Sequence, residues 1–296
     1  MAPLCEHLNI WLSFWAPNTQ KSYRLALDQF EASLSGVSLL NATELHCTRF
    51  ATTVRKQISP WSARHKILCL KSAYDYLVRN RLCKENYWDR ILASMPNSKP
   101  GEQRPTKLVP FEQVLRIISA PSSVVPEGLR DRAAFAVFFY CGLRSFELFE
   151  LTLGSLKSTE SGARYLLLSK TKAQRFQKVS LPDDAVPFVE AWQNHRELEG
   201  AKSSDFLFTK LHNGKSCGKL TRNILRNSWA YYTKACGVTG VGMHGARATL
   251  ITKLLSDGVS YREVQEVSRH ASIAMLETYD KRRFEIEDHA NRKIKF

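Results

Sequence analysis

Apolar residues recur at helical spacing through most of the chain, which predicts a mainly helical protein. Between about Asn18 and Arg90, few Gly or Pro residues interrupt this spacing. A second helix of this segment begins at Ser59-Pro60, because Ser caps helices and Pro is favoured in the first turn. The predicted helices 19–34 and 60–79 each have one apolar stripe, formed by Tyr23, Leu27, Phe30 and Leu34 in one and by Ile67, Leu70, Tyr74 and Leu77 in the other.

The stretch 96–110 contains four prolines, one glycine and no periodic pattern, which is typical of a linker. It separates a helical N-terminal domain, residues 1–95, from a larger domain, residues 111–296. A chain of 296 residues agrees with two domains.

The larger domain is predicted to be mostly helical, with a small β-hairpin. A near-continuous apolar run, Leu129–Cys141, predicts a buried core helix that Gly142 terminates. Segments 165–168 and 177–181 are predicted to be strands that flank a basic loop, residues 170–175. Further along, the pattern predicts a helix over 182–198, a short strand over 206–209, a helix over 244–255, and another helix that begins at Ser260 with a capping box to Glu263.

Charge indicates a polyanionic partner. The chain has 43 Lys and Arg against 28 Asp and Glu, a formal net charge of +15, spread along its whole length. Its seven cysteines are scattered and have no zinc-site spacing, so we expect reduced thiols and no metal site. The longest apolar run, 133–143, is too short to span a bilayer, and no secretory signal is visible. We therefore expect an intracellular protein without a membrane partner.

Three segments of the larger domain carry candidate chemistry. The first is Gly142-Leu143-Arg144-Ser145-Phe146-Glu147-Leu148, in which an arginine follows the buried helix and an acid stands three residues later. The second is His244-Gly245-Ala246-Arg247, which places an imidazole and a guanidinium on one helical face. The third places His270 nine residues before Tyr279. Each segment alone is more commonly explained by a structural ion pair or by packing.

Taken together and in this order, the segments resemble the tyrosine recombinase family, also known as phage integrases and including the Xer-like site-specific recombinases. Its motifs are an arginine in GLRxxEL, then HxxR, a His in a GHxS-like motif, and the tyrosine. The resemblance covers nearly the whole chain, since residues 1–95 resemble the family's core-binding domain. Ala246, Ala248, Arg269 and Asp280 depart from the usual pattern; position 269 is usually glycine.

The resemblance implies an enzyme that transfers DNA strands through a 3′-phosphotyrosine intermediate and a Holliday junction, without a cofactor. Tyr279 would be the nucleophile, and Arg144, Arg247, His244 and His270 would surround the phosphate. Glu147 would orient Arg144. A lysine on the hairpin would protonate the leaving oxygen, and the spacing fits both Lys170 and Lys172.

The resemblance also implies a homotetramer on two double-stranded DNA sites, accessory DNA-bending proteins as further partners, a C-terminal oligomerisation segment, and a cytoplasmic, nucleoid-associated location. We expect additional phosphate contacts from basic residues of the N-terminal domain and the linker, namely Arg64, Lys66, Lys71, Lys99, Arg104 and Lys107. Three alternatives stay open: a type IB topoisomerase that relaxes DNA, a non-catalytic DNA-binding protein of the same fold, and a generic helical scaffold.

Overall fold

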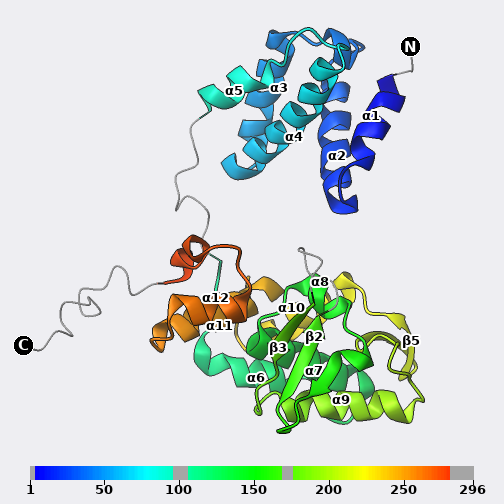
Figure 1. Ribbon diagram of the computed structural model, residues 1–296, viewed down its shortest axis with the longest axis vertical. Coiled ribbons are helices and arrows are strands. Elements are labelled where there is room, and N and C mark those ends of the chain that lie inside the picture. The colour runs from blue at the N-terminus through cyan, green and yellow to red at the C-terminus, as the bar shows by residue number, and fades with distance from the viewer. Residues whose placement is uncertain (1–3, 96–105, 169–175, 281–296) are drawn as a thin grey trace, which may run out of the picture. The chain divides into compact units, whose positions relative to one another are not determined.

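The computed structural model describes residues 4–95, 106–168 and 176–280, and the chain forms two compact units, 1–104 and 105–296 (Figure 1). The N-terminal unit is helical throughout its described part. Its helices are α1 (Leu4–Ser13), α2 (Pro17–Ser33), α3 (Glu44–Gln57), α4 (Pro60–Arg79) and α5 (Trp88–Ser94), with a short 3-10 turn at Leu39–Asn41.

Aromatic side chains form the core of the N-terminal unit. Phe30 of α2 meets Trp88 of α5 edge-to-face, with 4.9 Å between the ring centroids. Tyr74 of α4 is buried, and its hydroxyl donates to the carbonyl of Leu39 at 2.7 Å. The predicted cap of α4 is confirmed, because the Ser59 hydroxyl accepts a hydrogen bond from the Ser62 backbone N–H at 3.2 Å. All four residues of the stripe predicted for this helix are buried.

The C-terminal unit packs its helices around α7. The helices are α6 (Val114–Ser119), α7 (Pro126–Cys141), α8 (Ser145–Phe149), α9 (Val186–Leu198), α10 (Arg222–Ala235), α11 (Met243–Ser256) and α12 (Tyr261–Ser268), with 3-10 turns at Phe111–Gln113, Leu153–Ser155, Ile273–Met275 (η4) and Glu277–Tyr279 (η5). Helix α7 contacts α6, α9, α10 and α11, and apolar residues on every side of it are buried, as the sequence predicts for Leu129–Cys141. It begins three residues earlier than predicted, because Pro126 starts it.

Two small antiparallel sheets complete the C-terminal unit. One has the order β1 (Leu156–Ser158), β2 (Arg164–Leu168), β3 (Gln177–Ser180), and Leu168 pairs with Gln177 at the end of the predicted hairpin. The other consists of β4 (Thr209–His212) and β5 (Lys215–Lys219). The mainly helical fold with a small β-hairpin sheet is therefore confirmed, although strand β1 was not predicted.

Two predicted elements were misplaced. The strand expected over 206–209 begins at Thr209 instead, because Asn213 and Gly214 have positive φ angles of 50° and 72° and form the tight turn of the β4–β5 hairpin. Leu207, inside the predicted strand, is buried in the core, and its carbonyl accepts from the Trp192 ring N–H at 2.7 Å. The helix expected from residue 182 starts at Val186, because residues 182–185 form a turn.

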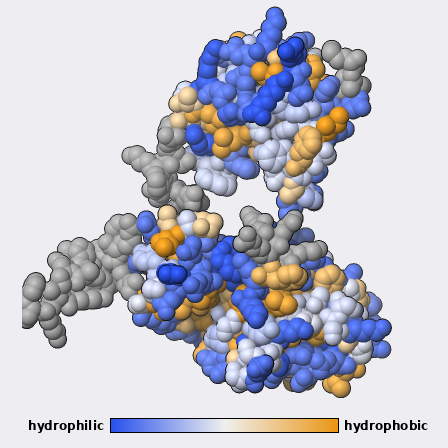
Figure 2. Space-filling model, viewed as in Figure 1, coloured by the Kyte–Doolittle hydropathy of each residue, from blue (hydrophilic) through white to orange (hydrophobic). Residues whose placement is uncertain are grey.

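The visible surface of each unit is mainly hydrophilic, with small separate hydrophobic patches (Figure 2). No helix in the described part of the chain is long and apolar enough to cross a lipid bilayer.

Candidate active site

The end of α7 brings the first arginine segment against α11. Gly142 ends α7 with a left-handed backbone, φ 56°, and a Cβ atom at this position would lie 2.9 Å from Leu250 Cδ2 of α11. Glycine is therefore required at this position both for the left-handed backbone and for the close packing against α11. Arg144 follows at the N-cap of α8, and its side chain is 27% exposed.

Arg247 of α11 connects two helix ends. It is 1% exposed, its Nη1 donates to the carbonyl of Gly142 at 2.5 Å, and its Nη2 donates to the carbonyl of Ser268, the last residue of α12. The last carbonyls of a helix have no partner within the helix, and they carry partial negative charge, so a guanidinium satisfies them well. Burial, together with Arg144 and Arg269, lowers the pKa of Arg247 to about 10, so it remains a cation at neutral pH.

Glu147 is the buried anion among these arginines. Its Oε1 accepts from Arg144 Nη1 at 2.9 Å, and its Oε2 accepts from the Arg144 backbone N–H at 2.7 Å and from Arg269 Nη2 at 2.8 Å. Burial opposes ionisation of Glu147, but Arg269 and Arg144 outweigh it and hold the pKa of this carboxyl below its ordinary value. The carboxylate is therefore charged and shared between two guanidinium groups.

The two histidines are neutral at physiological pH. His270 follows α12, and burial together with Arg247 and Arg144 lowers its pKa to about 4. Its Nδ1 lies 2.9 Å from the Ser268 hydroxyl. His244 lies in the first turn of α11. Part of the residue is exposed, yet partial burial of its ring and the charge of Arg247 lower its pKa as well. Both imidazoles are thus able to accept a proton.

Tyr279 lies beside His270, with 5.9 Å between the ring centroids and 30° between the ring planes. Its neighbour Leu276 is buried with Ile251, Leu255 and Val264, which anchors the η5 turn on α11 and α12. The next residue, Asp280, accepts a hydrogen bond from the Tyr261 hydroxyl at 2.6 Å. The tyrosine is therefore held from both sides within its own unit.

The phenol of Tyr279 is protonated at neutral pH. Burial raises its pKa, and the positive charges of Arg247 and Arg144 only partly oppose this effect. Attack by this oxygen therefore requires removal of its proton, and neutral His270, whose ring lies beside the Tyr279 ring, is a candidate acceptor. The same two arginines would stabilise negative charge on the phenolate and on a phosphate beside it.

The remaining predicted site residues belong to other segments of the chain. Lys170 and Lys172 lie outside the described residues, as do Lys99 and Arg104. Lys107 is exposed near the start of the C-terminal unit. In the N-terminal unit, Arg64, Lys66 and Lys71 lie on α4; Lys66 donates to Gln29, and Lys71 pairs with Asp75 at 2.8 Å and with Asp89 at 3.0 Å.

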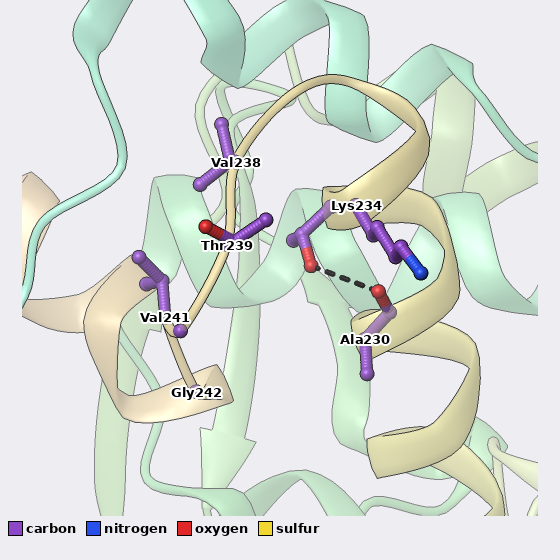
Figure 3. A pocket seen from close by; sticks show the side chains of 8 residues that line it. Ala230, Lys234, Val238, Thr239, Val241 and Gly242 are labelled. Atoms are coloured by element: carbon purple, nitrogen blue, oxygen red, sulfur yellow. Dashed lines mark hydrogen bonds between the residues drawn. The ribbon is translucent and has the colours of Figure 1, made fainter.

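A separate hollow of about 340 Å³ lies between the end of α10 and the loop that leads to α11. Figure 3 shows the loop with Val238, Thr239, Val241 and Gly242 beside α10, which carries Ala230 and Lys234. Lys234 is the single ionisable side chain among the lining residues, so no acid–base pair lines this hollow. Elsewhere in the described ranges, no group of three or more His, Cys, Asp or Glu side chains could hold a metal ion.

Comparison with known proteins decides the family. Residues 107–285 match the model of the phage integrase family. The chain belongs to this family. It is 28% identical over 270 residues to the tyrosine recombinase XerC of Myxococcus xanthus, covering 89% of this chain and 87% of that protein. It is 27% identical over 279 residues to XerD of Proteus mirabilis, covering 92% and 85%.

Solved structures agree on the fold. The XerH recombinase in a post-cleavage complex with its difH substrate superposes with a TM-score of 0.74 at 22% identity, covering 92% of this chain and 80% of that chain. A lambda integrase dimer bound to a COC′ core site superposes with a TM-score of 0.70 at 16% identity, covering 96% and 79%. This integrase chain therefore has the fold of these recombinases. Its family and its Xer relatives make it a DNA strand-transferase.

Two contacts that shape the integrase site were not predicted from the sequence. The link between Arg269 and Glu147 joins residues 122 positions apart, and the departure from glycine at position 269 was its single visible trace. The bond between Tyr261 and Asp280 likewise joins α12 to the residue after the tyrosine. Pairings of this kind depend on tertiary structure, and one sequence does not reveal them.

Proposed function

We propose that this integrase carries out site-specific recombination of double-stranded DNA with Tyr279 as its nucleophile. The observation that carries the proposal is the cluster itself: Arg144, Arg247, His244 and His270, from three separate segments, gather where Tyr279 joins them. A phosphodiester fits this cluster, because guanidinium groups bind phosphate oxygens in pairs and both imidazoles are neutral.

The chemistry is a transesterification. The Tyr279 oxygen attacks the phosphorus, its proton passes to a neighbouring base such as His270, and the bond to the 5′ oxygen breaks. The DNA 3′ end is then joined to the tyrosine, and the 5′ oxygen receives a proton from Lys170 or Lys172. Because the new phosphotyrosine ester keeps the energy of the broken bond, a 5′ hydroxyl from another strand can reverse the step without ATP.

Arg144 and Arg247 serve different parts of this step. Arg247 is almost fully buried and already bonded to two carbonyls, so it supplies a fixed positive charge. Arg144 is 27% exposed, so its remaining N–H groups can reach a phosphate oxygen. Glu147 orients Arg144 through its side chain and its backbone N–H.

Membership of the family supports a proposal for the wider assembly. We infer a homotetramer on two DNA sites, exchange of strands through a Holliday junction, help from accessory DNA-bending proteins, and a cytoplasmic, nucleoid-associated location. Residues 1–95 would bind DNA, residues 96–110 would link the domains, and the C-terminal end of 111–296 would join protomers. The net charge of +15 supports a salt-dependent affinity for DNA.

A suicide substrate tests the nucleophile. This DNA duplex, drawn from the sequence flanking the gene, carries a nick next to the cleavage site, so the cut strand cannot be rejoined. We expect a covalent protein–DNA adduct with the wild-type chain and none with Tyr279→Phe, which keeps the ring packing. A free 3′ hydroxyl without adduct would mean hydrolysis, and relaxation of a plasmid without exchange between two sites would favour the topoisomerase alternative.

A further inference from the structure

Arg269 adopts a backbone conformation that arginine rarely takes. It caps the C-terminus of α12 with φ 57° and ψ 40°, in the left-handed region where glycine has no steric penalty. Its side chain is nevertheless 6% exposed, turned inward onto the site. Contacts of the Arg269 side chain must therefore offset both the strain of its backbone and the burial of its charge.

Arg269 contacts Glu147 and backbone carbonyls at the ends of α7 and α12. Arg269 Nη2 lies 2.8 Å from Glu147 Oε2 and 3.3 Å from the carbonyl oxygen of Gly142, and its Nη1 donates to the carbonyl of Val267 at 2.9 Å. The left-handed turn also presents the carbonyl of Arg269 to Arg144, whose Nη2 donates to it at 2.9 Å. One residue therefore contacts Arg144 directly and also through Glu147.

The division of the Glu147 oxygens has a consequence for Arg144. A free carboxylate favours a paired contact with arginine, in which both oxygens receive N–H groups from one guanidinium. Here Oε2 is taken by Arg269 and by the Arg144 backbone, so the Arg144 side chain binds Oε1 alone. Arg144 then retains N–H groups for another anion, and its charge is only partly neutralised by Glu147.

We propose that Arg269 is a positioning residue for the strand-transfer reaction, which prevents Glu147 from sequestering Arg144 and holds the Arg144 guanidinium ready for the DNA phosphate. The proposal rests on the proposed function. Arg269 itself does not touch the DNA, because its side chain is 6% exposed and both of its Nη atoms already bond to Glu147 and to backbone carbonyls. Its effect is expected on the chemical step, not on the affinity for DNA.

The experiment measures single-turnover cleavage of the suicide duplex at saturating protein, beside the Kd for an intact duplex. For Arg269→Gly we expect cleavage to slow about tenfold, the size of one lost hydrogen bond between charged groups, with the Kd unchanged. Arg269→Lys keeps the charge toward Glu147 and should recover part of the rate. Arg269→Gln, which keeps most of the length but not the charge, should not.

A double-mutant cycle separates positioning from general stabilisation. If Arg269 acts through Glu147, the combination of Arg269→Gly with Glu147→Gln should be no slower than the slower single variant. The proposal would be overturned if the rate reductions of the two single variants multiply in the double variant, or if Arg269→Gly cleaves as fast as the wild type. Arg81→Gly is the folding control, since Arg81 is an exposed arginine with φ 58° in the other unit.

Folding failure and failure of the proposed function give different results. If Arg269→Gly unfolds in thermal denaturation while Arg81→Gly does not, the comparison of Arg269→Lys with Arg269→Gln decides instead, and equal rates would refute the proposal. If the wild-type chain forms no adduct at all, the proposed function fails. If it forms an adduct that every Arg269 variant forms equally fast, the positioning role alone fails.

Discussion

Removal of the buried charge of Glu147 should destabilise the C-terminal unit far more than loss of an exposed charge nearby. The carboxylate is 0% exposed and contacts both Arg144 and Arg269, so Glu147→Gln leaves these cations without their anion. Breaking a buried ion pair by removing one partner typically costs about 3–5 kcal/mol. For a domain of this size, that lowers the unfolding midpoint by roughly 6–20 °C.

Glu150→Gln is the matched control for this comparison. Glu150 lies three residues further, pairs with Lys219 at 2.6 Å, and is 38% exposed, so its loss should cost about 0–1 kcal/mol. Thermal and urea unfolding of the full chain at pH 7 would measure both variants against the wild type. Equal losses from Glu147→Gln and Glu150→Gln would refute the role of Glu147 as the counter-ion of the site.

The pH dependence of the Glu147 effect has a defined sign. The pKa of Glu147 is lowered in the folded chain, below the ordinary value of 4.5. Its contribution to stability is therefore complete above pH 4.5 and is lost as the pH falls through the folded pKa. The difference in unfolding free energy between the wild type and Glu147→Gln should shrink below pH 4.5, and a difference that widens there would contradict the argument.

Three further predictions concern other parts of the site. Arg247→Lys should slow single-turnover cleavage about 100-fold, because one ammonium cannot bond to both carbonyls and would not be held at the place where the guanidinium supplies its fixed charge. Exposed Arg262→Lys on the neighbouring helix is the control. Because the pKa of His270 is about 4, the cleavage rate should show no loss between pH 8 and pH 5.5, and an inflection near the ordinary histidine value of 6.5 would contradict the assignment. Gly245→Ala should lower the unfolding free energy by about 1–3 kcal/mol, because the added Cβ would lie 2.3 Å from Val241 Cγ1 and 2.8 Å from the carbonyl oxygen of Lys107. Urea unfolding measures this loss. An unchanged unfolding free energy would contradict the prediction and show that these neighbours shift to make room for the methyl group.

Local signals predicted the helices well. The cap at Ser59, the left-handed end at Gly142 and the capping box of Ser260 with Glu263 all depend on residues within a few positions of one another. The strand pair β4–β5 was misplaced although Asn213-Gly214 is a strong hairpin signal, because the apolar residues near Leu207 belong to the core and not to a strand.

Local sequence signals did not predict the contacts within the site. Family motifs named the arginines, histidines and tyrosine, but not what holds them in place. Arg247 bonds to a carbonyl 105 residues away, and Arg144 bonds to one 125 residues away. Which acceptor each guanidinium finds is decided by how α7, α11 and α12 pack, so one sequence without aligned relatives cannot supply it.

The arrangement links the stability of the fold to the chemistry of the site. Helix C-termini leave carbonyl groups without partners, and in this unit the ends of α7 and α12 are satisfied by Arg247 and Arg269, to which we assign the fixed charge of the site and the positioning of Arg144. Substitution of these arginines must therefore affect folding and catalysis together. Tyr279 differs, because its hydroxyl makes no hydrogen bond to the described residues and its turn is anchored by Leu276. Its oxygen can thus leave for phosphorus and return without breaking the contacts that hold the cations.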